Sequence, residues 1–198
     1  MTPHDPKADL HRYLTSVRDT VVWKLEGLSE YDVRRPLTPT GTNLLGLVKH
    51  LSCVEFEYFG PTFGRPHGEG ALPWYDDSAA PNADMWATAD ESRAEILGLY
   101  ERARAHADAT IEALPLDAPG QVAWWGDKGA VTLQRVMLHV TAETNRHAGH
   151  ADIVRELIDG QVGLRRDVGD IDGGDAAWYR EYRDRLEAVA KQAQARQG

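Results

Sequence analysis

The chain has 198 residues, of which 42% are hydrophobic, and its formal net charge at pH 7 is −9. This length and apolar content suit one domain of ordinary size with a single core, with or without a small appendage. The acidic balance argues against nucleic acid as the main partner, since phosphate binding needs clustered Lys and Arg, and no apolar run approaches the roughly 20 residues that cross a bilayer.

The N-terminus and the cysteine content indicate a compartment. Residues 1–6 contain neither the basic region nor the apolar region of a signal peptide. Cys53 is the only cysteine, so no intrachain disulfide can form, which fits a reducing environment. We therefore expect a cytoplasmic domain.

The first half of the chain predicts two helices. Residues 7–28 carry apolar side chains at helical spacing, and residues 29–42 hold enough Pro and Gly to be interpreted as a loop. Asn43 is a good N-cap for a second helix that runs to about Phe59. The apolar face of this second helix also contains one histidine, His50; its other members are Leu44, Leu47, Val48, Leu51, Val54 and Tyr58.

Residues 60–87 form a long segment rich in Gly, Pro and Asp that also contains tryptophans. A loop of this length in a compact domain is usually functional or is ordered by its own aromatic side chains. A third helix, capped by Asp90 or by Thr88, is predicted to reach about Leu114. A turn-rich segment with Trp124 and Trp125 follows at 120–130.

The remaining sequence predicts a fourth long helix and one accessory helix. Thr132 caps the fourth, which ends at Gly160, and an Asp/Gly-rich linker leads to a last helix from about Asp175 to Gln194. The pattern contains no convincing strand, so it predicts an all-α fold, a four-helix bundle at 1–160. Residues 161–198 are expected to supply a linker and a C-terminal helix that packs on the bundle or on a partner subunit.

Polar residues interrupt the apolar seam of the fourth helix. Taken in alternating steps of four and three, this seam comprises Val136, Val140, Glu143, His147, His150, Val154 and Leu157. A buried carboxylate costs several kcal/mol unless it is paired or bound to a cation. Glu143 and His147 stand four residues apart, so both side chains lie on one face of the helix and can hold a single ion.

If the seam of the second helix faces the fourth, His50 can join Glu143 and His147 inside the bundle. Two imidazoles and a carboxylate, with a further position left open, suit catalytic zinc, although nickel, iron or manganese would also accept them. The alternatives are a core histidine at position 50 and a salt bridge from Glu143 to Arg146, Arg135 or Arg155. A polar core without any metal is a weaker hypothesis.

Several other side chains need an interpretation. His139, four residues before Glu143, is a reserve ligand, and His150 is interpreted as a ligand, as a donor that orients the site, or as a surface histidine. Cys53 is more typical of a small core residue than of a nucleophile. The 60–87 loop and Trp124–Trp125 are candidate pocket walls, although such tryptophans more often plug the end of a bundle.

Two stretches carry a family resemblance. Leu47-Val48-Lys49-His50-Leu51 and the stretch Glu143–Glu156 resemble the DinB-like superfamily, in particular its actinobacterial branch related to the mycothiol-dependent maleylpyruvate isomerases. The resemblance covers roughly residues 7–160. It implies a four-helix bundle whose divalent metal is held by His50, Glu143 and His147; a Glu at the second position is the form seen in the isomerase. After Gly160 we expect only a linker and one helix, in place of the separate C-terminal domain of that isomerase.

The resemblance implies a divalent-metal-dependent enzyme that activates a low-molecular-weight thiol, such as mycothiol, for transfer or isomerisation. Metal-bound water attacking an ester or amide would be a hydrolytic variant. The competing hypothesis is a non-catalytic helical bundle that binds a metal or a small ligand. We expect a small-molecule substrate in either case, no nucleic acid or membrane partner, and a homodimer if the last helix packs on a second subunit.

Overall fold

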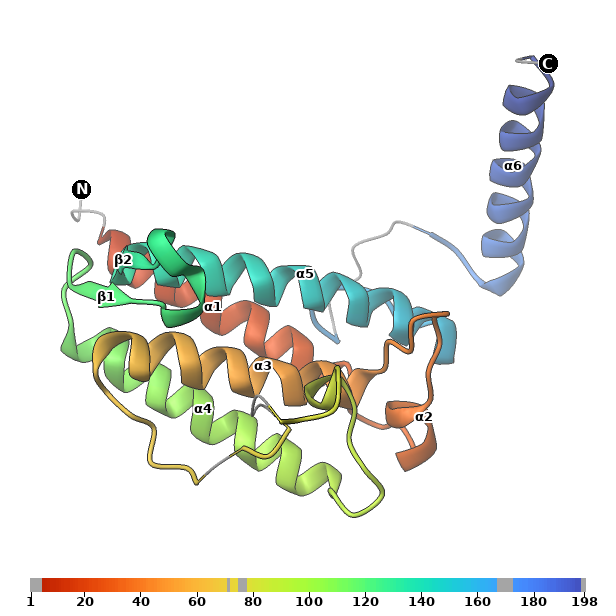
Figure 1. Cartoon of the computed structure of the whole chain (residues 1–198). Helices are drawn as coiled ribbons and strands as arrows, with labels where there is room; N and C mark the ends of the chain where they lie inside the picture. The colour runs from red at the N-terminus through yellow and green to blue at the C-terminus, as the bar shows by residue number, and fades with distance from the viewer. Residues whose placement is uncertain (1–4, 71, 75–77, 167–172, 197–198) are drawn as a thin grey trace.

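A computed structural model describes residues 5–70, 72–74, 78–166 and 173–196. Four long helices lie side by side: α1 (Pro6–Trp23), α3 (Leu44–Phe59), α4 (Arg93–Ala113) and α5 (Leu133–Asp159) (Figure 1). The other elements are α2 (Glu30–Arg34), α6 (Ala176–Ala195), β1 (Pro119–Gln121), β2 (Ala130–Thr132) and the short 3-10 helices η1 (Pro61–Phe63), η2 (Ala83–Met85) and η3 (Ala123–Lys128). The all-α prediction is confirmed.

Helix α3 is the central element of the bundle, packing against both α4 and α5, while α1 packs against α5. Every residue of α3 is buried except His50 and Glu57. Most of its apolar residues share one core with those of α1, α4 and α5, and Phe56 packs in a second, smaller cluster with Leu99 and Ala103 of α4. His50, the one histidine of α3, therefore lies at the edge of the apolar core rather than inside it.

The helix starts follow the capping residues of the sequence. The Asn43 side chain accepts a hydrogen bond from the backbone N–H of Gly46, and Thr132 does the same for Arg135, as predicted. The cap expected at Asp90 or Thr88 is wrong, because Ser92 forms a reciprocal capping box with Glu95 and starts α4 there.

Three further predictions need correction. The first helix ends at Trp23 rather than at Leu28, and the segment interpreted as a loop contains α2, whose N-cap is Ser29. A small antiparallel pair is also present, because β1 and β2 pair with Gly120 opposite Val131. This pair carries η3 between its strands and leads directly into α5.

The segment after α5 is held against the end of the bundle before the chain continues to α6. The buried Lys24 donates to the carbonyl of Gly163 at 2.6 Å, and the indole N–H of Trp23 donates to the carbonyl of Leu164 at 2.7 Å. None of the residues of α6 is buried, and Figure 1 shows this helix standing away from the bundle. The expected packing partner of α6 stays a prediction.

No helix among the described residues is both long enough and apolar enough to span a bilayer.

Candidate metal centre

Helices α3 and α5 bring the three predicted ligands together. One ligand atom each from His50, Glu143 and His147, here called the metal group, can be chosen so that all lie within 4.8 Å of one another. Oε1 of Glu143 lies 3.0 Å from Nε2 of His147 and 3.8 Å from Nε2 of His50. Two imidazole nitrogens and a carboxylate oxygen are donors that zinc and its neighbours in the first transition row accept, so this group fits a divalent ion.

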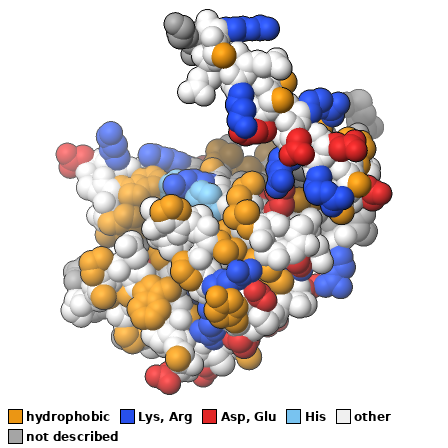
Figure 2. Space-filling view, turned by 90° about the vertical axis from the view of Figure 1, so that its right-hand side faces the viewer, with side chains coloured by type: hydrophobic (Ala, Val, Ile, Leu, Met, Phe, Trp, Pro, Cys, Tyr) orange, Lys and Arg blue, Asp and Glu red, His pale blue; other side chains and the backbone are white. Residues whose placement is uncertain are grey.

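The group is closed on one side and open on the other. The His147 side chain is only 6% exposed, whereas His50 is 19% and Glu143 is 26% exposed. Figure 2 shows histidine atoms at the surface of this face of the molecule, beside a basic side chain and among hydrophobic ones; the opening of the metal group itself follows from the exposed fractions of His50 and Glu143. A small molecule can therefore approach the group from solvent, as a catalytic rather than a purely structural site requires.

Asp84 contacts one of the three predicted ligands, and the sequence reasoning missed it. Its Oδ2 lies 2.6 Å from Nδ1 of His50, which leaves Nε2 of that ring directed toward Glu143. A carboxylate behind a histidine in this way fixes the tautomer and orientation of a metal ligand. Asp84 belongs to η2 in the long loop, so no helical periodicity could mark it.

The loop that carries Asp84 is anchored to α3 by hydrogen bonds. The Asn43 amide donates to the carbonyl of Met85 at 3.1 Å, and the Lys49 ammonium donates to the carbonyl of Trp86 at 3.1 Å. Asn82 starts η2 in the left-handed backbone region, at φ 61°. This anchoring holds Asp84 at a fixed place beside His50.

The charge states suit metal binding. Burial and the nearby His50 lower the pKa of His147, so its ring is neutral at pH 7 and has a free lone pair. Burial opposes ionisation of Glu143, but the adjacent His147 and His50 hold its pKa below the usual range. The hydrogen bond from His50 lowers the pKa of Asp84 as well. Both carboxyl groups are therefore ionised at neutral pH.

The salt-bridge alternative for Glu143 finds little support. Arg155 binds Asp159, and Arg135 lies over the ring of Trp125 with its guanidinium carbon 5.0 Å from the ring centre. Arg146 comes to 4.0 Å from Glu143, but its side chain is 65% exposed. Such a contact contributes little in water, so it does not explain an acid on this face.

The two remaining histidines of α5 have different surroundings. His139 does not join the three-residue group; its ring packs against Tyr58 and Trp125, each with ring centres 4.8 Å apart, and burial lowers its pKa. His150 is exposed, and its Nδ1 lies 3.4 Å from Nδ1 of His147. His150 thus lies beside Nδ1 of His147, whereas Nε2 of His147 faces Glu143.

Cys53 is buried on α3. The indole N–H of Trp74 points to its sulfur at 3.3 Å, and burial raises the pKa of the thiol to about 12. A thiol in this state is protonated and shielded, which makes it a core residue and not a nucleophile.

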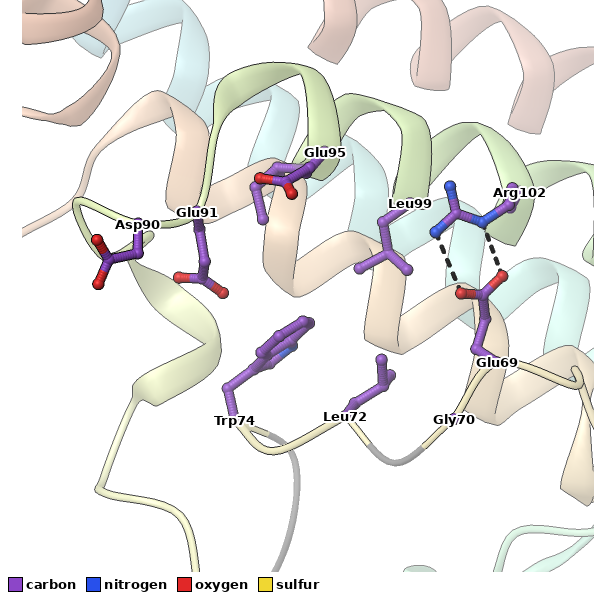
Figure 3. A pocket seen from close by; sticks show the side chains of 10 residues that line it. Glu69, Gly70, Leu72, Trp74, Asp90, Glu91, Glu95, Leu99 and Arg102 are labelled. Carbon is purple, nitrogen blue, oxygen red and sulfur yellow. Dashed lines mark hydrogen bonds and ion pairs between the residues drawn. The ribbon is translucent and has the colours of Figure 1, made fainter.

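Much of the long loop covers α4 rather than the metal group. Figure 3 shows a pocket there with Leu72 and Trp74 on the loop side and Leu99 and Arg102 on the helix side. Three of its charged residues are paired within the protein: Arg102 binds Glu69 at 2.7 Å, and Glu91 binds Lys49 at 2.8 Å. None of the three predicted metal ligands lines this pocket.

Comparison with known families gives a match. The sequence profile of the family described as Mycothiol-S-transferase matches residues 9–160. This range includes most of α1, the whole of α3, α4 and α5, and all three members of the ligand group. A comparison with curated proteins finds no match.

Proposed function

The chain belongs to the mycothiol-S-transferase family, and from this we propose that it transfers the thiol of mycothiol to an electrophile with the help of a divalent ion held by His50, Glu143 and His147. The observation that carries the proposal is the convergence of two histidine Nε2 atoms on one carboxylate oxygen of Glu143. The matching profile is that of a transferase, so transfer is favoured over isomerisation.

The proposed reaction is a substitution at carbon. A bond forms between the mycothiol sulfur and an electrophilic carbon, the bond from that carbon to its leaving group breaks, and the leaving group keeps that electron pair. The thiol proton passes to solvent, and no oxidant or reductant is needed. A divalent ion supplies the positive charge that lowers the pKa of a bound thiol, so that thiolate is present at neutral pH.

The protein residues prepare the site for that ion. Asp84 accepts the Nδ1–H of His50 and keeps the lone pair on Nε2. His147 stays neutral because burial lowers its pKa. The carboxylate of Glu143 offsets part of the positive charge of a divalent ion. The partial exposure of His50 and Glu143 leaves room for the thiol to approach.

Zinc is the ion we propose, because two imidazoles and one carboxylate with a further open position are a common catalytic zinc set. Nickel, iron and manganese accept the same donors. We also propose that the protein acts in the cytoplasm on small molecules. A homodimer formed through α6 would be compatible with this site, which draws all its ligands from one chain.

The test combines metal analysis with an assay of thiol consumption. Wild type, His147→Ala and His139→Ala are purified from zinc-supplemented medium, and the loss of mycothiol is followed with an alkylating electrophile. We expect close to one equivalent of metal in wild type and in His139→Ala, turnover in wild type, and loss of both metal and turnover in His147→Ala.

Two outcomes would contradict the proposal in different ways. Less than a tenth of an equivalent of metal in wild type would mean that the three residues form a polar core without an ion. A full equivalent of metal without turnover on any electrophile would favour a non-catalytic metal-binding bundle.

A further inference from the structure

Four aromatic rings lie beside the metal group: Tyr58 of α3, Trp124 and Trp125 of η3, and His139 of α5, here called the aromatic cluster. Ring centres are 5.1 Å apart for Tyr58 and Trp124 and 4.8 Å apart for Trp125 and His139. These distances lie in the range at which aromatic rings attract one another. Residues from three elements of the fold thus form one aromatic surface.

The cluster is adjacent to the metal group along α5. His139 precedes Glu143 by four residues, a displacement of about 6 Å along the helix axis. The charge of Glu143 also acts on both His139 and Tyr58. A single ring with its leaving group can bridge this span from the cluster to the ligands.

The cluster has a buried floor and one exposed ring. Tyr58 is buried and Trp125 is partly buried against the core, whereas Trp124 is 49% exposed. Trp125 therefore acts as the plug that the sequence suggested, while its neighbour Trp124 is available to a ligand. One exposed apolar side chain alone has no significance. Trp124 differs because its ring contacts Tyr58, which in turn contacts His139, one helical turn from Glu143.

The hairpin around Trp124 is held in place before any ligand arrives. Arg135 donates to the carbonyl of Ala130 at 3.2 Å and lies over the ring of Trp125. The backbone N–H of Val122 donates to the carbonyl of Gly129 at 2.8 Å. A surface that is already ordered loses little conformational freedom when a ligand binds to it.

We infer that the aromatic cluster binds the electrophilic substrate, and that this substrate carries an aromatic or similarly flat apolar group that stacks on Trp124. This inference rests on the proposed function. Polar groups, Arg146 and His150, lie on the other side of Glu143 along α5 and suit the hydrophilic thiol. The two substrates would then approach the metal group from opposite directions along the helix.

The first measurement is binding, which does not depend on turnover. Quenching of tryptophan fluorescence by 1,3-dinitrobenzene, an aromatic ring without a leaving group, is titrated in wild type, Trp124→Ala and Trp178→Ala. Trp178 is an exposed tryptophan of α6, outside the bundle, and serves as the matched control. We expect saturable quenching in wild type and in Trp178→Ala, and its loss in Trp124→Ala. Absence of saturable quenching in wild type, or its persistence in Trp124→Ala, would overturn the inference.

The second measurement is selectivity between two electrophiles, 1-chloro-2,4-dinitrobenzene and the small aliphatic iodoacetamide. We expect Trp124→Ala to lower kcat/KM by about 3–10-fold for the aromatic compound, the loss that one aromatic contact accounts for. The value for iodoacetamide and the KM for mycothiol should stay unchanged, and Trp124→Phe should restore most of the aromatic activity. An equal loss for both electrophiles, or a raised KM for mycothiol, would contradict the inference.

The two measurements also separate this inference from the proposed function. If wild type consumes neither electrophile, the proposed function fails and the quenching titration alone decides whether the cluster binds an aromatic ligand. If both electrophiles are consumed and Trp124→Ala behaves as wild type in both assays, the proposed function stands and the assignment of the cluster fails.

Discussion

Asp84 and His50 are 34 residues apart and belong to different elements, yet Oδ2 of Asp84 lies 2.6 Å from Nδ1 of His50. The loop that crosses α3 is anchored directly after Asp84, through the carbonyl groups of Met85 and Trp86. The pairing links an otherwise irregular segment to the metal group, and it gives the first prediction.

Replacing Asp84 by Ala should weaken metal binding by about 10–100-fold, the usual effect of removing a carboxylate that orients a ligand histidine. Asp84→Asn should lose less, because its side-chain oxygen still accepts the Nδ1–H. Affinity is measured by competition with a chromophoric chelator, and Asp90→Ala, at an exposed carboxylate, is the control. An unchanged affinity in Asp84→Ala would show that His50 needs no partner or is not a ligand.

Replacing Glu143 by Leu should abolish metal binding and leave a folded bundle, because the change removes a charge that burial disfavours. Metal content and the thermal unfolding midpoint are measured on the same sample. His139→Ala is the matched control on the same helix, one turn away, and should keep its metal. Full occupancy in Glu143→Leu would mean that the ligand set is wrong.

The Cys53 thiol should not react with Ellman's reagent in the folded protein at mildly alkaline pH. Its pKa of about 12 leaves only a very small fraction as thiolate, and the side chain is buried. Because the raised pKa belongs to the folded state, unfolding in guanidinium should release one reactive thiol. Trp74→Ala, which removes the indole over the sulfur, should speed the reaction of the folded protein. Rapid labelling of native wild type would contradict the burial described for Cys53.

Arg18 and Glu55 form a buried ion pair. A double substitution separates the contribution of the pair from the cost of leaving one buried charge without a partner. Two hydrogen bonds of 2.7 and 2.6 Å join the side chains, and both are 0% exposed. Arg18→Met alone should lower the free energy of unfolding by about 3–5 kcal/mol, because it leaves a buried carboxylate without a partner. Adding Glu55→Leu should recover much of that loss. Urea unfolding of the three proteins checks this, and a double variant no more stable than Arg18→Met would argue against the pair.

Removal of residues 173–198 should leave the metal group intact and change the oligomeric state. The exposed stripe of α6 includes Trp178, Tyr182 and Leu186, and most of the stability of a helix in a protein comes from packing of such an apolar face. We expect the full chain to be a dimer by light scattering and the truncated chain to be a monomer with unchanged metal content. If the full chain and the truncated chain are both monomers, α6 does not mediate self-association.

Much of the fold could be predicted from helical periodicity and capping chemistry, and the errors have physical reasons. Thr88 and Ser92 each have a Glu three positions later, so the capping-box pattern occurs twice in the sequence, and only the pair Ser92 and Glu95 forms the reciprocal box that starts α4. The three-residue strands β1 and β2 are too short to show an alternating pattern. Their pairing depends on how the hairpin packs, which the local sequence does not specify.

The seam of α5 shows how far a prediction from periodicity remains accurate. Val136, Val140 and Val154 are buried as predicted, but Leu157 is 60% exposed. A repeat of alternating four and three residues has a period of 3.5, whereas a straight helix turns once in 3.6, so the predicted face drifts by about 20° per heptad. The ligands lie near the middle of the helix, where this drift is small.

The parts of the candidate site that lie on helices could therefore be predicted from the sequence, and the parts that lie on loops could not. Glu143 and His147 follow from spacing on one helix, and His50 from its place among apolar neighbours. Asp84 and the ring contacts of Trp125 depend on how the loop and the hairpin fold back on α3 and α5. No local pattern contains that information.

The near-complete burial of α3 has a consequence for mutational tolerance. A saturation scan of residues 44–59 scored by protein abundance would find most positions intolerant, with His50 and Glu57 the permissive exceptions. The same library scored by retention of the ion would make position 50 intolerant and leave position 57 permissive. Position 50 would then be the residue of α3 that tolerates substitution when folding is scored and does not tolerate it when retention of the ion is scored.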